Sequence, residues 1–326
     1  MTVRDRLLAV VVAVLWGANF IAIHVGLEYF PPVFLAGLRM LVLAVPAVLL
    51  VPRPRVPLRW LVGYGLGFGT LQFLFLFLAM YAGMPAGLAS LVLQASGPFT
   101  LVLGAILLRE EVTRRQWAGI GVAVAGLATI ALARAQSAAL LPVVLTLLGA
   151  LGWAAGNLCN RLAQRGAQAE RASAQRGAQA ERASAQWDGA TVNPLHLTMW
   201  MTVVPPVPLL AASAVVEGPG AGWAAVGAMV TWDGLPGLGA LVYLSVVATV
   251  LAAGIWTGLM RRYPAGLVAP HSLLVPVVGM TLAMVLLGER PSVVELLAGA
   301  VVVGGVLAAS APSRRRAPAE PAATVG

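Results

Sequence analysis

Ten long apolar stretches follow one another along this chain, and they constrain its fold more than any other feature. A helix needs about 20 consecutive apolar residues to cross the roughly 30 Å hydrocarbon core of a bilayer. Lipid offers no partners for unpaired backbone groups, so these stretches are predicted to be α-helices. The sequence therefore predicts an all-α polytopic membrane protein with ten transmembrane helices. Their approximate limits are residues 7–27, 33–51, 60–82, 85–108, 116–133, 140–162, 193–216, 236–259, 264–287 and 293–311.

The arginines follow an alternating pattern that gives these spans a direction. All 21 residues counted as lysine or arginine are arginine, and 18 of them lie at the chain ends or in every second loop. The other loops hold only Arg134 and Arg290, and Arg39 lies inside the second span. Loops on the cytoplasmic side carry the excess of arginine, so both termini are predicted to be cytoplasmic. The alternating set is Arg4, Arg6, Arg53, Arg55, Arg59, Arg109, Arg114, Arg115, Arg161, Arg165, Arg171, Arg176, Arg182, Arg261, Arg262, Arg314, Arg315 and Arg316.

Composition excludes several classes of protein. A chain that is 60% hydrophobic and 10% charged is not an ordinary soluble domain, where about a quarter of residues are charged. The net charge of +9 lies in loops that flank the membrane, so it favours anionic lipid headgroups and not nucleic acid. The single cysteine, Cys159, excludes an intramolecular disulfide and a cysteine-clustered metal site, and no cofactor is expected. The first span is longer than the apolar core of a signal peptide, so it is predicted to stay uncleaved.

The two halves of the chain resemble each other. Residues 85–113 align without a gap with residues 264–292; both segments begin with PAGL, and Glu110 falls opposite Glu289. Likewise, Trp16 and Asn19 in the first span are matched by Trp153 and Asn157 in the sixth. Each half has five spans, an odd number, so the two repeats must lie in opposite orientations. Inverted repeats around a midplane interface are a common build of secondary transporters, which indicates transport by alternating access.

Six segments also carry a resemblance to a known family. On these segments the chain resembles the EamA branch of the drug/metabolite transporter superfamily, and within it the bacterial exporters of O-acetylserine and cysteine. The resemblance implies a fold of two inverted five-helix repeats, export of small amino-acid metabolites, the bacterial inner membrane as location, and no enzymatic activity. The segments are WGANF (16–20), PPVFLAGLR (31–39), GMPAGLASLVLQA (83–95), GWAAGN (152–157), residues 243–263, and VAPHSLLVPVVG (268–279) with LLGER (286–290).

The domain organisation follows from the repeats. Residues 1–134 form the first EamA repeat, and residues 135–162 are the sixth span, which starts the second repeat. Residues 163–192 form a cytoplasmic loop that contains the unit RGAQAERASAQ twice, a composition typical of a helix or a flexible linker. Residues 193–311 complete the second repeat, and the polar, proline-containing residues 312–326 are predicted to be a disordered cytoplasmic tail.

Candidate substrate-binding residues are the polar groups inside the spans, because such groups are costly in hydrocarbon and face the bundle interior. Asn19 and Asn157, the latter on one face with Trp153, either tie helices together or contact substrate. Arg39 either binds a substrate carboxylate through its guanidinium, or has a structural role in which it caps carbonyl groups or extends to the outer interface. A small-molecule zwitterion would need such donors and acceptors.

Gln72, Gln94 and His271 complete the candidate set. Gln94 precedes Pro98 by one turn, and His271 lies between Pro270 and Pro276. A proline within a span frees a carbonyl group and can bend the helix, so Gln94 and His271 either line a cavity, which we expect, or have structural roles. Gln72 is an interior donor and acceptor in span three.

Other features leave alternatives open. Glu110 and Glu289 at the span ends either close a gate or carry protons, or each lies near a neighbouring arginine at headgroup level. Spans five and ten are rich in glycine and alanine, which places them at the periphery with a homodimer contact as one use. The rival class, a membrane transferase, needs a cluster of acid, base or metal-binding residues, whereas the three histidines are scattered.

Overall fold

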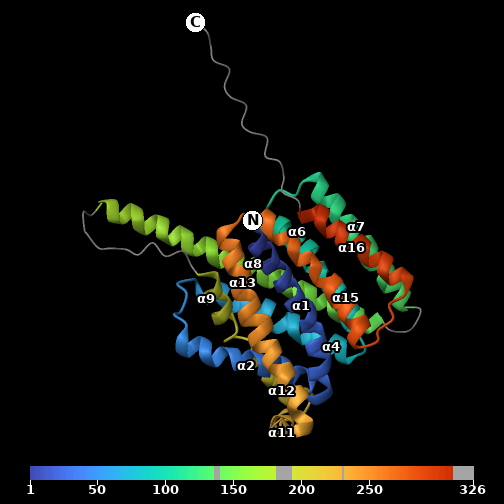
Figure 1. The fold of residues 1–326 in the computed structure, drawn as a ribbon. Coiled ribbons are helices and arrows are strands. Elements are labelled where there is room, and N and C mark those ends of the chain that lie inside the picture. The colour runs from blue at the N-terminus through green and yellow to red at the C-terminus, as the bar shows by residue number, and fades with distance from the viewer. Residues whose placement is uncertain (136–139, 181–192, 230, 311–326) are drawn as a thin grey trace.

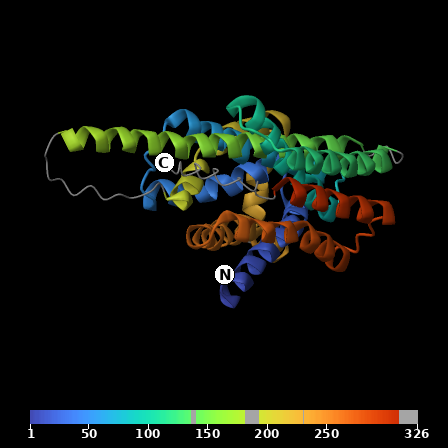
Figure 2. The ribbon, with the colours of Figure 1, turned by 90° about the horizontal axis from the view of Figure 1, so that it is seen from above.

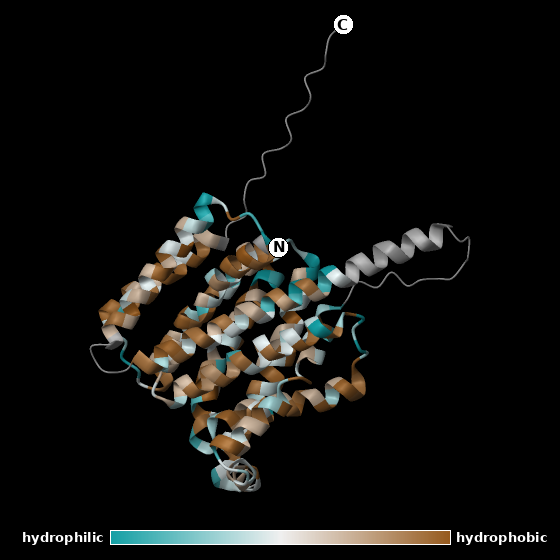
Figure 3. Cartoon of the chain, turned by 180° about the vertical axis from the view of Figure 1, so that it is seen from behind, coloured by the Kyte–Doolittle hydropathy of each residue, from teal (hydrophilic) through white to brown (hydrophobic). Residues whose placement is uncertain are grey.

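A computed structural model describes residues 1–135, 140–180, 193–229 and 231–310. These residues form helices and contain no strand. Nine of the helical segments are long and apolar enough to cross a membrane, and Val293–Ala309 is a tenth, shorter apolar helix within the same residues. Hydrophobic residues cover the helices, and hydrophilic residues concentrate at their ends (Figure 3). The predicted fold, an all-α polytopic membrane protein with ten spans, is therefore confirmed.

The first repeat contains spans one to five. Span three changes from α-helix to π-helix and back, and span four contains a short 3-10 segment. Its elements are α1 (Val3–Tyr29); α2 (Pro32–Leu50); α3 (Leu58–Tyr64), η1 (Gly65–Leu71) and α4 (Gln72–Tyr81); α5 (Ala86–Val92), η2 (Leu93–Ala95) and α6 (Ser96–Leu108); and α7 (Arg114–Ala135).

The second repeat contains spans six to ten and has the same irregularities in the equivalent spans. A π-helix interrupts span eight and a 3-10 segment interrupts span nine. Its elements are α8 (Leu140–Ala180); α9 (Pro194–Met201) and α10 (Pro206–Val216); α11 (Ala221–Ala228); η3 (Trp232–Gly234), α12 (Leu235–Val242), η4 (Tyr243–Leu251) and α13 (Ala252–Arg262); α14 (Ala265–Val268), η5 (Ala269–Leu273) and α15 (Leu274–Leu286); and α16 (Val293–Ser310).

Packing between the spans follows the repeat. The equivalent spans two and seven pack together through α2 and α10, and spans four and nine through α5 and α15. Span one packs on span nine through α1 and α15, and its equivalent, span six, packs on span four through α8 and α6. The first span of each repeat (span one or span six) therefore packs on the fourth span of the other repeat (span nine or span four), as expected for two inverted copies of one five-span unit.

Spans five and ten, α7 and α16, lie side by side at one edge of the bundle in both ribbon views (Figure 1, Figure 2). A Cβ atom added to Gly119 would meet the backbone of Ala309, and one added to Gly305 would meet the backbone of Ala123. The small residues therefore let these two helices of the same chain approach closely. Their peripheral place is as predicted. Gly119 and Gly305 are used within the chain, whereas a Cβ atom added to Gly121 or Gly304 would meet nothing within 4 Å.

Two segments differ from the sequence-based boundaries. The sixth span was predicted to end at residue 162, but α8 continues through the first copy of the duplicated unit to Ala180 and extends beyond the bundle (Figure 1). Alanine, glutamine and arginine favour helix, which explains the continuation. The short helix α11 lies where a loop was expected between spans seven and eight. Residues 181–192 and the predicted tail at 312–326 lie outside the described residues.

Candidate transport site

Arg39 on α2 is buried, with 2% of its surface exposed, and it binds the irregular part of span eight. Its Nη2 atom donates to the carbonyl oxygen of Leu244 at 3.1 Å and to Oγ1 of Thr249 at 3.0 Å. Both partners belong to the π-helix η4, where the wider turn changes the usual backbone pairing. Among the described residues, Arg39 forms no ion pair with a carboxylate. Carbonyl capping, one of the predicted roles, is thus observed.

Aromatic side chains connect Arg39 to Trp153. The guanidinium carbon of Arg39 lies 4.2 Å from the ring centroid of Phe73. Phe73 contacts Phe68 edge-on with centroids 5.9 Å apart, and Phe68 contacts Trp153 edge-on at 5.8 Å. The π-face of an aromatic ring attracts a cation, so Phe73 helps to hold the buried charge. Residues from spans two, three and six, which are far apart in the sequence, therefore form one continuous cluster.

Several polar atoms in the bundle interior have neither solvent contact nor a hydrogen-bond partner among the described residues. They are Oδ1 of Asn19, Oε1 of Gln72, and Nε and Nη1 of Arg39. A buried polar atom without a partner costs about 1–3 kcal/mol, so each one needs a physical reason. The two acceptor oxygens can bind an ammonium group, and the two donor nitrogens can bind a carboxylate. Together these atoms are suited to a zwitterionic substrate.

The remaining predicted site residues are less closely joined. Nδ2 of Asn157 lies 3.5 Å from Oγ1 of Thr100 on α6, at the limit of a hydrogen bond. Gln94 is partly buried within the 3-10 segment η2. Nδ1 of His271 lies 3.2 Å from the carbonyl oxygen of Val268, one turn earlier in the same span. Within the described part of the chain, no hydrogen bond links Gln94 or His271 to the other candidates.

Sequence reasoning missed the hydrogen bonds that join η4 to α1. Nε1 of Trp16 on α1 donates to the carbonyl oxygen of Ala248 at 3.0 Å, and the hydroxyl of Tyr243 donates to the carbonyl oxygen of Leu15 at 2.9 Å. The sequence marks Trp16 through its match to Trp153 and the WGANF segment, but it does not indicate the contact with Ala248. Nothing in the pattern around Thr249 indicates that it meets Arg39, because the contact joins positions 210 residues apart.

Charged residues at the two ends of the bundle make specific contacts. At one end, here called the Glu289 end, Glu289 accepts hydrogen bonds from the amides of Ala86 at 2.6 Å and Gly87 at 3.1 Å. Glu217 likewise accepts from the amides of Val33 at 2.7 Å and Phe34 at 2.9 Å. Anionic groups stabilise helix N-termini, which is where these four amides lie. Among the described residues no ion pair joins Glu289 to an arginine, one of the predicted alternatives; its hydrogen-bond partners there are backbone amides.

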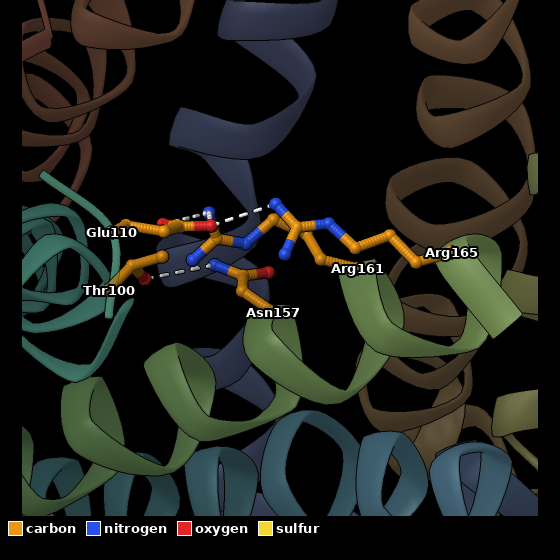
Figure 4. Close-up of polar contacts among 5 residues, drawn as sticks. All are labelled: Thr100, Glu110, Asn157, Arg161 and Arg165. Carbon is orange, nitrogen blue, oxygen red and sulfur yellow. Dashed lines mark hydrogen bonds and ion pairs between the residues drawn. The ribbon is translucent and has the colours of Figure 1, made fainter. Parts of the chain in front are cut away.

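At the opposite end, here called the Arg161 end, Glu110 pairs with two arginines of α8 (Figure 4). Its carboxylate lies 3.0 Å from Nη1 of Arg161 and 2.9 Å from Nη2 of Arg165. The predicted pairing of Glu110 with arginine is confirmed. Its partners come from the sixth span, however, and not from the arginines next to it in the sequence.

A helical membrane protein with two inverted five-span repeats, irregular helices in equivalent spans and a polar, partly unpaired interior belongs to the class of membrane transporters. The profile of the EamA-like transporter family matches this chain twice, at residues 6–132 and 183–311. The chain belongs to the EamA-like transporter family and is a multi-pass membrane protein.

Known relatives are similar to this chain over nearly its whole length. A protein of Salmonella typhimurium named "Probable amino-acid metabolite efflux pump" is 40% identical over 308 residues, which is 94% of each chain. A protein of Streptantibioticus cattleyicolor named "Probable terminal-alkyne amino-acid exporter" is 27% identical over 91% of this chain and 90% of its own. A solved crystal structure is similar with a TM-score of 0.56 at 20% identity, covering 95% of this chain and 97% of its own, and it supports the fold alone.

Proposed function

We propose that this protein is a secondary transporter that exports small amino-acid metabolites, similar to cysteine or O-acetylserine, by alternating access. The observation that carries the proposal is the buried guanidinium of Arg39, which has no acidic partner among the described residues and keeps two unpaired donors. A carboxylate is the natural partner for such a group. The name of the relative that is 40% identical supports the same class of substrate.

The other interior groups fit the rest of such a substrate. The unpaired oxygens of Asn19 and Gln72 are acceptors for an ammonium group. Trp153 and Asn157 are proposed to contact the substrate from the sixth span, and Gln94 and His271 from the irregular segments of spans four and nine. None of these residues other than Arg39 carries a fixed charge that would hold the substrate too tightly to release it.

Orientation and assembly are part of the proposal. The excess of arginine at the Arg161 end supports a cytoplasmic position for that end and for both termini, in the inner membrane of a bacterium. A homodimer is also proposed, with a contact on α7 and α16 at Gly121 and Gly304, where an added Cβ atom would meet nothing within 4 Å. The surrounding bilayer is a further partner, and no nucleic acid is expected to bind.

A broader substrate range is the second candidate. The relative named for export of a terminal-alkyne amino acid favours an exporter of other amino acids or drug-like metabolites that shares the same recognition of a carboxylate and an ammonium group. The interior aromatic cluster of Phe68, Phe73 and Trp153 is an apolar surface against which a longer side chain could lie.

Purified protein in liposomes tests the proposal. Liposomes loaded with unlabelled cysteine or O-acetylserine should take up the labelled compound by counterflow, faster than protein-free liposomes. A panel of amino acids and larger metabolites then separates the narrow from the broad substrate range. Counterflow with none of these compounds would refute the proposal, and chemical conversion without movement would indicate a membrane transferase instead.

A further inference from the structure

The ion pair between Glu110 and α8 places a carboxylate of the protein itself on two guanidinium groups (Figure 4). Nη1 of Arg161 donates to both carboxylate oxygens, at 3.0 and 3.4 Å, and Nη2 of Arg165 donates to Oε1 at 2.9 Å. The geometry at this end of the bundle is therefore already suited to a carboxylate. The cluster includes Asn157, one turn before Arg161 on α8, and Asn157 is a proposed substrate contact.

Arg161 also keeps binding capacity that Glu110 does not use. Its Nε and Nη2 atoms have no exposed surface and no hydrogen-bond partner among the described residues. These two nitrogens form the side of a guanidinium that binds a carboxylate with two parallel hydrogen bonds. In the close-up, the guanidinium lies between Glu110 and the pair formed by Asn157 and Thr100 (Figure 4).

A glycine on α6 keeps this place free of side chains. A Cβ atom added to Gly104 would lie 2.6 Å from Oε2 of Glu110 and 3.1 Å from Nη2 of Arg161. Any larger residue would therefore push the carboxylate and the guanidinium away from their present positions.

The repeat shows where Glu110 can go when it leaves Arg161. Its equivalent, Glu289, accepts hydrogen bonds from the amides of Ala86 and Gly87 at the start of span four. The alignment is supported by the backbone, because Arg109 and Gly288 before the two glutamates are both left-handed, with φ of 52° and 65°. The positions equivalent to Ala86 and Gly87 are 265 and 266, at the start of span nine.

Alternating access rocks one repeat of a transporter against the other around the binding site. Because the two halves of this chain share one design, each half can take up the arrangement that the other half now has. In the opposite state, Glu110 is thus expected to accept hydrogen bonds from the backbone amides at positions 265 and 266. The move would draw the ends of spans four and nine together and close the Arg161 end.

We propose that Arg161 binds the carboxylate of the exported amino-acid metabolite on its free Nε–Nη2 edge, that this second carboxylate releases Glu110 from Nη1, and that Glu110 then caps span nine. This inference rests on the proposed function. One carboxylate replaces another on Arg161, so the charge balance around the buried nitrogens is kept during the exchange. Arg39 then receives the substrate deeper in the bundle.

The test measures concentration dependence of counterflow in liposomes for L-cysteine, kept reduced, and for L-cysteine methyl ester, which lacks the carboxylate. Protein-free liposomes supply the background. Arg161→Gln is expected to raise KM for cysteine roughly tenfold or more, the loss expected for a paired, charged hydrogen bond, with little change for the ester. Glu110→Gln removes the competing carboxylate, so it should lower KM for cysteine while it slows the maximal rate.

A purely structural ion pair makes different predictions. Arg161→Gln and Glu110→Gln would then break the same contact and shift KM in the same direction, and the preference for acid over ester would not change. Either result would overturn the inference. Arg165→Gln is the matched control, because it weakens the pair with Glu110 but keeps the free edge of Arg161, so the preference for the acid should remain.

Two further measurements separate failure of this inference from misfolding of the variant and from failure of the proposed function. If Arg161→Gln does not fold, Arg161→Lys keeps the charge without the planar pair of donors, and the preference for the acid should still fall at least about threefold. An unchanged preference in that variant would also refute the inference. If the wild-type protein transports neither cysteine nor any other amino-acid metabolite, the proposed function itself fails, whatever the variants do.

Discussion

Replacing Arg39 with methionine separates a role in substrate binding from a role in holding the fold. Methionine keeps a long, flexible side chain in the same space but removes the charge. The variant loses the two hydrogen bonds to Leu244 and Thr249 and the contact with Phe73. Hydrogen bonds to charged groups contribute about 1.5–3 kcal/mol each and a desolvated cation–π contact about 2 kcal/mol, which sets the upper limit of the loss.

Two features of the structure reduce the net cost. The hydroxyl of Thr249 also donates to the carbonyl oxygen of Leu244 at 2.9 Å, so that carbonyl group keeps a partner when Arg39 is removed. The variant also avoids burying a charge that has no acidic partner among the described residues, a penalty of several kcal/mol per ion. The two effects are of similar size, so the free energy of unfolding should change little. We expect the melting temperature in detergent to stay within about 5 °C of wild type.

Transport should respond much more strongly. A substrate carboxylate that loses its hydrogen bonds to the guanidinium loses about 1.5–3 kcal/mol, which corresponds to a roughly 10- to 100-fold increase in KM. Counterflow in liposomes, normalised to folded protein, measures this value. Thr249→Val is the matched control, because it removes one anchor of Arg39 and keeps the charge; its KM should rise far less. A large fall in melting temperature with unchanged KM would show that Arg39 only supports η4.

Three further predictions concern topology, packing and the polar interior. In a background where Cys159 is alanine, a cysteine at Ala178 should not react with an impermeant thiol reagent on intact cells; labelling from outside would reverse the proposed orientation. Gly119→Val should lower the melting temperature by separating α7 from α16, whereas Gly121→Val on the same helix should not, because a Cβ atom added there meets nothing within 4 Å; equal effects would contradict the packing argument. Asn19→Ala and Gln94→Ala should each weaken apparent substrate affinity roughly 5- to 30-fold, the equivalent of about 1–2 kcal/mol, with normal membrane insertion; wild-type KM in both variants would make them structural residues.

Much of the fold could be predicted from the sequence because each of its determinants is a local property. Transfer of a residue between water and lipid depends on its own side chain, so runs of apolar residues locate the spans and arginines orient them. The match between Glu110 and Glu289 showed the repeat, and the left-handed backbone at Arg109 and Gly288 agrees with that alignment. The polarity of Arg39 within a span was enough to mark it as a candidate site residue.

The partners of the polar residues were decided only by tertiary structure. Arg39 meets η4, Glu289 meets the start of span four, and Glu110 meets α8, each across a large separation in sequence. Such contacts depend on how each helix is rotated about its axis and where it crosses its neighbours, and hydropathy does not encode either quantity. The π-helix η4 also escaped prediction, because its backbone is held by side chains from other spans, such as Trp16 on the carbonyl oxygen of Ala248. The sequence determined which residues must avoid lipid, and the packed structure determined which of them meet.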